Sequence, residues 1–352
     1  MGVKHVGLAD LFKKAPKLKA DPQVRWFGKL PTYADYYASK GDEAWAVEFQ
    51  DWVLKGFELY AERARPAGKA ASRLPISACA LRLPRSGMTV FASLLDYGGD
   101  MRGRPFPLCF YAGIPSAQWP GPTHDRLCPA NRVMQDLLAL RRDVPRFLNS
   151  PGRFETAFGE RVVNLDGLDG ESSNSEWVEL AVKVPLAEWF AGWARQEPAA
   201  LPECPVEPKL ADWYQALAKW GDNIARHESE GFEPTLRFPL APLPAVQVQL
   251  AGWIRWLETR MDLGRRLYSV LVSGDLQEGT ARFSVVAHEL IPDDFLLLTP
   301  LARTLPYVDD ASRVGLNSTG ASEASGTDGQ SAGLALVPAT WAEFANSGAA
   351  TN

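Results

Sequence analysis

Cysteine and histidine are scarce in this sequence, with four of each in 352 residues. The cysteines stand singly and form no Cys-x-x-Cys pair, so the spacing fits neither a zinc knuckle nor a redox pair. A chain long enough to bury a large core does not depend on disulfide bonds for its stability. We therefore expect no metal site, and we expect the protein to be cytoplasmic.

Long apolar runs and a strong charge of one sign are also missing. No run approaches the roughly 20 residues that a membrane-spanning helix needs, and the net charge is −5. We therefore expect no integral membrane segment and no nucleic-acid partner. Residues 1–22 carry five lysines, and with Leu8, Leu11 and Phe12 they form a weakly amphipathic pattern that is short and interrupted by proline. They predict a solvated basic arm, with docking to a membrane surface or to a partner protein as the alternative.

The motifs of common enzyme classes are missing as well. The sequence contains no Gly-rich nucleotide loop, no Gly-x-Ser-x-Gly elbow and no His-Glu-x-x-His motif. His124 precedes Cys128 by four residues, but flanking prolines favour a loop there, and no third group is evident that would orient the imidazole. We expect no catalytic residue and no cofactor. The alternative is a hydrolase that uses Cys128 with His124, or a carboxylate pair formed by Asp35 and Asp100.

Aromatic residues and periodic apolar patterns, by contrast, are abundant. Twelve tryptophans lie largely in segments of helical periodicity, where they are typical of a packed core. A strand at 24–29 and a helix from Asp42 are followed by three strand patterns that are expected to pair antiparallel. We therefore expect the α/β class, as a layered α/β/α sandwich with a mixed, largely antiparallel sheet.

Composition divides the chain into four parts. The basic arm at 1–22 precedes an α/β domain core that is expected over 23–196. A proline-rich stretch then opens a second α/β part over 197–308, which is expected to pack on the first. Residues 309–352 are rich in Ser, Gly and Ala and predict a flexible tail. We interpret its apolar end, around Trp341, as a frayed terminus, with a short tethered docking motif as the alternative.

Two short clusters combine a tight turn with charged residues. The candidates for a partner-binding surface or a fixed corner of the fold are Lys29, Pro31, Asp35, Tyr36, Asp100, Gly103 and Arg104. Gly103 allows a backbone conformation that other residues avoid. The guanidinium of Arg104 is suited to a carboxylate, which either Asp100 or Asp35 can supply. The structural interpretation is a buried Arg–Asp clasp between two loops, and the functional one is a surface that meets a partner.

The order and spacing of these clusters resemble the TagF (ImpM) family of type VI secretion proteins. Residues 28–36, Gly-Lys-Leu-Pro-Thr-Tyr-Ala-Asp-Tyr, are similar to the family pattern GKLP-x-x-GDF, with Ala34 in place of a glycine. Residues 49–54 resemble the family's W/F-D-x-W-L helix. Residues 100–108, Asp-Met-Arg-Gly-Arg-Pro-Phe-Pro-Leu, match D-x-x-GR-x-FPL. The likeness is best over residues 24–114.

The resemblance implies a non-enzymatic bacterial regulator with the α/β sandwich fold of that family. Family members repress the assembly or firing of the type VI secretion machine after translation, at least partly by binding an FHA-domain scaffold protein. We therefore expect a cytoplasmic repressor that works through protein–protein interaction and has such a scaffold as its partner. A structural role within the secretion assembly, docked through the basic arm, is a further alternative.

Overall fold

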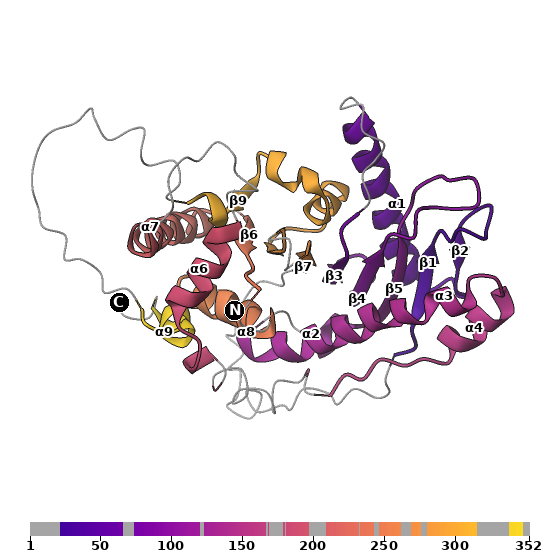
Figure 1. Cartoon of the computed structure of the whole chain (residues 1–352), viewed down its shortest axis with the longest axis horizontal. Coiled ribbons are helices and arrows are strands. Elements are labelled where there is room, and N and C mark those ends of the chain that lie inside the picture. The colour runs from indigo at the N-terminus through magenta and orange to yellow at the C-terminus, as the bar shows by residue number, and fades with distance from the viewer. Residues whose placement is uncertain are drawn as a thin grey trace, which may run out of the picture.

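The structure is a computed structural model that describes residues 22–65, 74–119, 123–166, 168, 179, 181–196, 209–231, 233–242, 246–261, 269–275, 280–314 and 338–347. Its strands are β1 (Arg25–Gly28), β2 (Tyr37–Ala38), β3 (Ser77–Leu83), β4 (Met88–Leu95), β5 (Leu108–Pro115), β6 (Thr235–Pro239), β7 (Ser269–Ser273), β8 (Arg282–Val286) and β9 (Val308–Asp310). Within these residues they form one sheet of nine strands, in the order β2-β1-β5-β4-β3-β7-β8-β6-β9 (Figure 1).

Pairing in this sheet is mostly antiparallel. Of the strand pairs that the structure describes, β6 with β9 is parallel and the others are antiparallel. The predicted mixed, largely antiparallel sheet is therefore confirmed. Ser77 on β3 lies opposite Ser273 on β7. The parts expected at 23–196 and 197–308 thus contribute strands to one continuous sheet.

Helices cover both faces of the sheet. The α-helices are α1 (Ala44–Ala64), α2 (His124–Ala139), α3 (Val144–Phe147), α4 (Pro151–Gly159), α6 (Leu186–Gln196), α7 (Leu210–Ser229), α8 (Val246–Glu258) and α9 (Trp341–Asn346). The 3-10 helices are η3 (Ser116–Gln118), η4 (Leu140–Arg142), η7 (Pro292–Leu298), η8 (Pro300–Thr304) and η9 (Ala311–Arg313). Figure 1 shows α1 on one side of β3, β4 and β5 and α2 on the other, which confirms the predicted sandwich. In the described part of the chain, no helix has the length and apolar character to cross a bilayer.

Two apolar cores lie on opposite faces of the sheet, because successive side chains of a strand point to opposite sides. On β5, Phe110 packs in the core that includes residues of α2, α7 and α8. Its neighbour Tyr111 packs in the other core, with residues of α1 and η7. Gly56 of α1 permits a close approach of η7 there, since a Cβ on it would lie 2.2 Å from the Cβ of Phe295.

The C-terminal end of the described chain belongs to the first of these cores. The flexible tail predicted over 309–352 is wrong for residues 309–314, which complete β9 and form η9. It is also wrong for residues 338–347, in which α9 buries Trp341 and Phe344 completely. The interpretation as a frayed terminus is wrong for the same reason. Composition indicated a tail because large apolar residues are sparse over the stretch as a whole. Two aromatic side chains in the right place are nevertheless enough to anchor its end.

The remaining parts of both termini are not described. The basic arm predicted at 1–22 lies outside the described residues apart from Pro22, whose carbonyl accepts a hydrogen bond from Val163 N (3.0 Å). Most of the predicted tail, at 315–337 and after 347, also lies outside them.

Candidate functional site

The proline corner, residues 28–36, begins where β1 ends. Gly28 has a φ of +149°, and a Cβ on it would lie 2.1 Å from the carbonyl oxygen of Pro107. The absence of a side chain therefore lets two backbones approach closely. The carbonyl before Pro31 accepts a hydrogen bond from Tyr33 N (3.0 Å). This closes a turn with proline at its second position, where the fixed φ of proline is favoured.

The arginine loop, residues 100–108, folds around the carboxylate of Asp100. This carboxylate accepts hydrogen bonds from the backbone amides of Arg102 (2.9 Å) and Arg104 (3.0 Å), and from Nε of Arg104 (2.7 Å). Gly103 has a φ of +71°, the left-handed conformation that its place in the sequence predicted. An aspartate that accepts from the amides following it holds its own loop in one shape.

Three contacts join the proline corner to the arginine loop. Met101 N donates to the Tyr33 carbonyl (2.7 Å), and Nη2 of Arg104 donates to a carbonyl of the corner (2.6 Å). Nζ of Lys29 lies 3.3 Å from Oδ2 of Asp100. We call this arrangement, with the Asp100 carboxylate at its centre, the clasp.

The buried cation of the clasp is Lys29. Its side chain is 7% exposed and that of Asp100 is fully buried, whereas the side chain of Arg104 is 48% exposed. Of the two carboxylates that the sequence left open, Asp100 and not Asp35 contacts Arg104, and the expectation that Arg104 is buried is wrong. Arg104 reaches the carboxylate from the surface, and Lys29 meets it from within.

The clasp keeps Asp100 ionised. Burial by itself raises the pKa of this carboxyl, but hydrogen bonds from Arg104, Arg102 and Lys29 outweigh burial and lower the pKa from 3.8 to about 2. A carboxyl whose pKa is lower in the folded state stabilises that state at any pH above its ordinary pKa. The contribution is lost as the pH falls through the folded-state value.

Replacing Asp100 with alanine tests the clasp. The substitution leaves the Lys29 ammonium buried without its carboxylate and removes the acceptor that shapes the loop. We expect the melting temperature at neutral pH to fall by roughly 10 °C. Asp35→Asn is the matched control, because Asp35 is exposed and asparagine keeps the oxygen that accepts from the next amide. It should change the melting temperature by less than about 2 °C.

The difference in stability between wild type and Asp100→Ala is expected to depend on pH. Because the pKa of Asp100 is lowered from 3.8 to about 2, the stability difference between wild type and Asp100→Ala should be constant above about pH 5. It should then shrink as the pH falls towards 2, where the carboxyl becomes protonated in the folded protein. A difference that keeps its full size at pH 2 would contradict an ionised, hydrogen-bonded Asp100.

Tyr36 is held in place beside the clasp by other rings. It stacks on Phe27 with 5.4 Å between ring centroids and meets Phe106 edge to face at 4.9 Å. Nζ of Lys29 lies 4.9 Å from the centroid of the Tyr36 ring, a cation–π contact. These contacts orient the tyrosine, although 43% of it remains exposed.

The clasp presents a set of exposed side chains, which we call the clasp surface. They are Pro31, Asp35, Tyr36, Met101, Arg102 and Arg104. Met101 is 63% exposed, the largest exposure among the large apolar residues that the structure describes. Tyrosine, methionine and arginine are enriched at protein interfaces. The clasp surface therefore has the chemistry of a protein docking site.

Met101 and Arg102 were not among the residues singled out from the sequence. They occupy the two variable positions between Asp100 and Gly103, where the family pattern specifies no residue. Their exposure could have been predicted from the sequence, because side chains in the middle of a tight turn usually point into solvent.

No family model and no curated protein matches this chain. A solved structure similar to part of it is the crystal structure of PA0076 from Pseudomonas aeruginosa PAO1. The two are 19% identical, with a TM-score of 0.28, over 39% of this chain and 62% of PA0076. The chain thus spans less than two thirds of PA0076. A likeness at this TM-score supports no inference about function.

Three residues of the alternative hydrolase sites, Asp35, Asp100 and His124, form other contacts in the structure. The Asp100 carboxylate is enclosed by the clasp, while exposed Asp35 accepts a hydrogen bond from the amide that follows it (2.8 Å). His124 and Cys128 lie in α2, so the loop predicted there is wrong. The imidazole and the backbone amide of His124 both bind the carboxylate of Glu258, which joins α2 to α8. Within the described ranges, no group of three or more His, Cys, Asp or Glu residues is placed to hold a metal ion.

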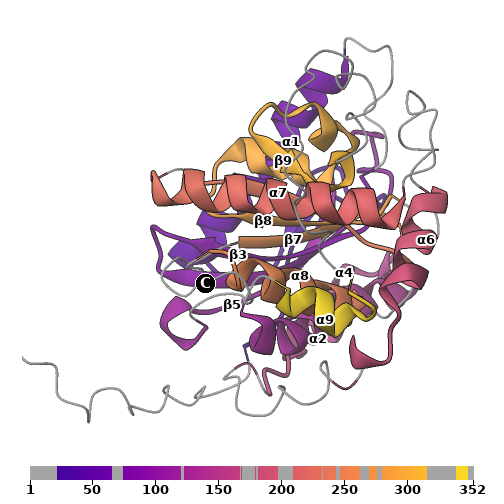
Figure 2. The same cartoon turned by 90° about the vertical axis from the view of Figure 1, so that its left-hand side faces the viewer.

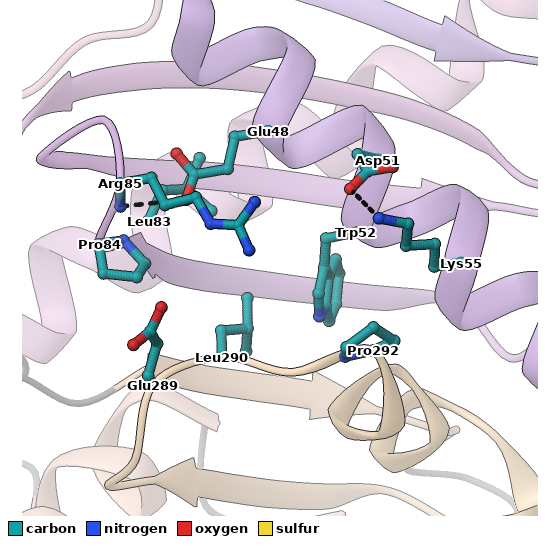
Figure 3. A pocket seen from close by; sticks show the side chains of 10 residues that line it. All are labelled: Glu48, Asp51, Trp52, Lys55, Leu83, Pro84, Arg85, Glu289, Leu290 and Pro292. Carbon is teal, nitrogen blue, oxygen red and sulfur yellow. Dashed lines mark hydrogen bonds and ion pairs between the residues drawn. The ribbon is translucent and has the colours of Figure 1, made fainter.

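A small hollow lies between α1, the β3–β4 turn and residues 289–292 (Figure 3). The Glu48 carboxylate accepts hydrogen bonds from Arg85 N (3.2 Å) and the next amide (3.0 Å). Nε1 of Trp52 donates to the Ile291 carbonyl (2.9 Å). The hollow has a volume of about 90 Å³, whereas ligand pockets usually measure about 300–1,000 Å³. Its contacts tie α1 to the sheet and to η7.

Proposed function

We propose that this chain is a non-enzymatic regulator of a bacterial type VI secretion system. It acts after translation as a repressor, by binding a cytoplasmic FHA-domain scaffold protein through the clasp surface, and it needs no cofactor. One observation carries the proposal. The two patterns that resemble the TagF family, at 28–36 and 100–108, fall on the two segments that the clasp joins into a single surface.

The clasp suits a docking role because its backbone is fixed while its outer side chains remain available. A loop that is already held in one shape loses little conformational freedom when a partner binds. Tyr36 supplies an oriented aromatic anchor, and Met101 supplies an adaptable apolar contact beside it. Arg102 and Arg104 add donors that match carboxylate or carbonyl groups of a partner.

Met101→Asp is the substitution that tests this proposal. Binding of the purified variant to the FHA-domain scaffold protein of the same bacterium would be measured by calorimetry. We expect binding at least about tenfold weaker than that of wild type, because a buried charge replaces an apolar contact at the interface. The melting temperature should stay within about 2 °C of wild type, since the side chain is 63% exposed.

Val182→Asp is the matched control. Val182 is 55% exposed and precedes α6 in the second half of the chain. This variant should bind the scaffold as wild type does. A wild-type protein that does not bind the scaffold would contradict the proposed function. Binding that survives both Met101→Asp and Arg102→Glu would contradict the assignment of the clasp surface.

A further inference from the structure

An aromatic groove between α6, α7 and α8 is filled by the C-terminal segment of the chain, residues 338–347, and Figure 2 shows α9 of this segment against α8. Trp341 and Phe344 are completely buried. The ring centroid of Trp341 lies 4.7 Å from that of Trp189 on α6. The ring centroid of Phe344 lies 6.2 Å from that of Trp213 on α7. Two anchors at positions i and i+3 are the arrangement by which grooves recognise short helices.

The groove is shaped to admit the indole ring. Gly252 of α8 forms its floor, since a Cβ there would lie 2.0 Å from Nε1 of Trp341. The same Nε1 donates to the Val248 carbonyl (3.0 Å). Trp341 N donates to the Val184 carbonyl (2.9 Å), and Leu186 N donates to a carbonyl of the segment (3.0 Å). Ring insertion and main-chain pairing are thus combined, as in a complex with a peptide.

The segment carries the signal for its own helix start. Oγ1 of Thr340 accepts a hydrogen bond from Glu343 N (3.2 Å), and the Glu343 carboxylate accepts one from Ala339 N (2.7 Å). This is close to the reciprocal pattern of a capping box. Residues 338–347 therefore contain, within one short sequence, both the cap and the two anchors.

A long covalent connection leads to this segment. Residues 315–337 separate it from Val314 and are mostly Ser, Gly, Ala and other small or polar residues. A connection of this length can span roughly 80 Å when fully extended. That exceeds the roughly 50 Å width expected of a globular chain of this size. The covalent length thus does not restrict α9 to the groove of its own molecule.

We propose that the aromatic groove is a helix-binding site, that residues 338–347 are its tethered ligand, and that a second copy of the chain can supply the same segment. The ligand class is a short helix capped by threonine, with tryptophan and phenylalanine three positions apart. The segment of a second copy is identical and can make every contact described here. This inference is independent of the proposed function, because it uses neither the clasp surface nor the scaffold.

The test keeps the whole chain and makes the connection cleavable. A protease site is introduced within residues 320–330, and the folded protein is cleaved. A fluorescent peptide of residues 336–349 is then titrated into cleaved and uncleaved protein, and its anisotropy is measured. We expect the peptide to exchange into the cleaved protein with an affinity at least about tenfold tighter than for the uncleaved protein. The intact connection holds the competing segment at an effective concentration on the order of 1 mM.

A peptide that carries both Trp341→Ala and Phe344→Ala is the matched control and should not bind. Two batches of intact protein labelled with donor and acceptor dyes should also develop energy transfer when mixed, and excess unlabelled peptide should abolish it. Unfolding on cleavage, or a retained fragment that never exchanges, would show that α9 is a permanent part of the core and overturn the proposal. Equal binding of the control peptide would overturn it as well.

Discussion

Trp341→Ala is expected to lower the free energy of unfolding by about 3–5 kcal/mol. The indole is fully buried, packs against the rings of Trp189 and Trp253, and fills the space above Gly252. Alanine would leave a cavity in the aromatic groove and remove the hydrogen bond to α8. Urea denaturation followed by circular dichroism measures the loss without depending on the fluorescence of the deleted residue.

Val47→Ala is the control for this measurement. Val47 is apolar but 52% exposed on α1, so its truncation should change the free energy of unfolding by less than about 0.5 kcal/mol. A Trp341→Ala variant as stable as wild type would show that α9 does not occupy the groove in solution.

Gly28→Ala is expected to cost about 2–4 kcal/mol of folding stability and to open the clasp. Gly28 has a φ of +149°, which side chains rarely adopt, and its new Cβ would lie 2.1 Å from the Pro107 carbonyl oxygen. Because the clashing atom belongs to the backbone, either the proline corner or the arginine loop must move. Lys29 follows directly in the chain, so its contact with Asp100 should be lost at the same time. Chemical denaturation measures the loss of folding stability, and binding to the scaffold protein measures the opening of the clasp.

Gly152→Ala is the matched glycine substitution. Gly152 lies in α4 without a positive φ, and apart from its chain neighbours and the backbone of its own helix no described atom lies within 4 Å of the position that a Cβ would take. Alanine there should be neutral or should stabilise the protein by up to about 1 kcal/mol, since it is the better helix former. Equal losses of folding stability from Gly28→Ala and Gly152→Ala would show that the close backbone approach at Gly28 does not cause the destabilisation.

The sandwich could be predicted because its patterns follow directly from chain geometry. In β5 the alternation of side chains matches the two faces of the sheet, and the spacing in α1 matches one face of a helix. β6 was not predicted, because prolines before and after it argue against a strand on local grounds. It forms because β8 pairs along its whole length. Pairing with a strand that is distant in the sequence stabilises β6, and a local sequence pattern carries no information about that pairing.

The candidate site shows the same limit at the level of single residues. The contact of Arg104 with Asp100 could be anticipated, since both lie in one glycine-containing loop. The burial of Lys29 could not, because it depends on β1 and a loop about 70 residues away meeting at one corner. The burial of Trp341 could not be predicted either, because the indole fits only where Gly252 of another helix has no side chain.

The strand order also affects how the chain matures on the ribosome. β3 lies between β4 and β7, yet Ser77 on β3 pairs with Ser273 on β7, more than half the chain's length later. Until β7 has been synthesised, β3 offers a free edge with apolar side chains on both faces, the kind of surface to which other strands add. We therefore expect the nascent N-terminal half to be prone to pairing with other chains until translation has passed residue 273, unless a chaperone covers β3.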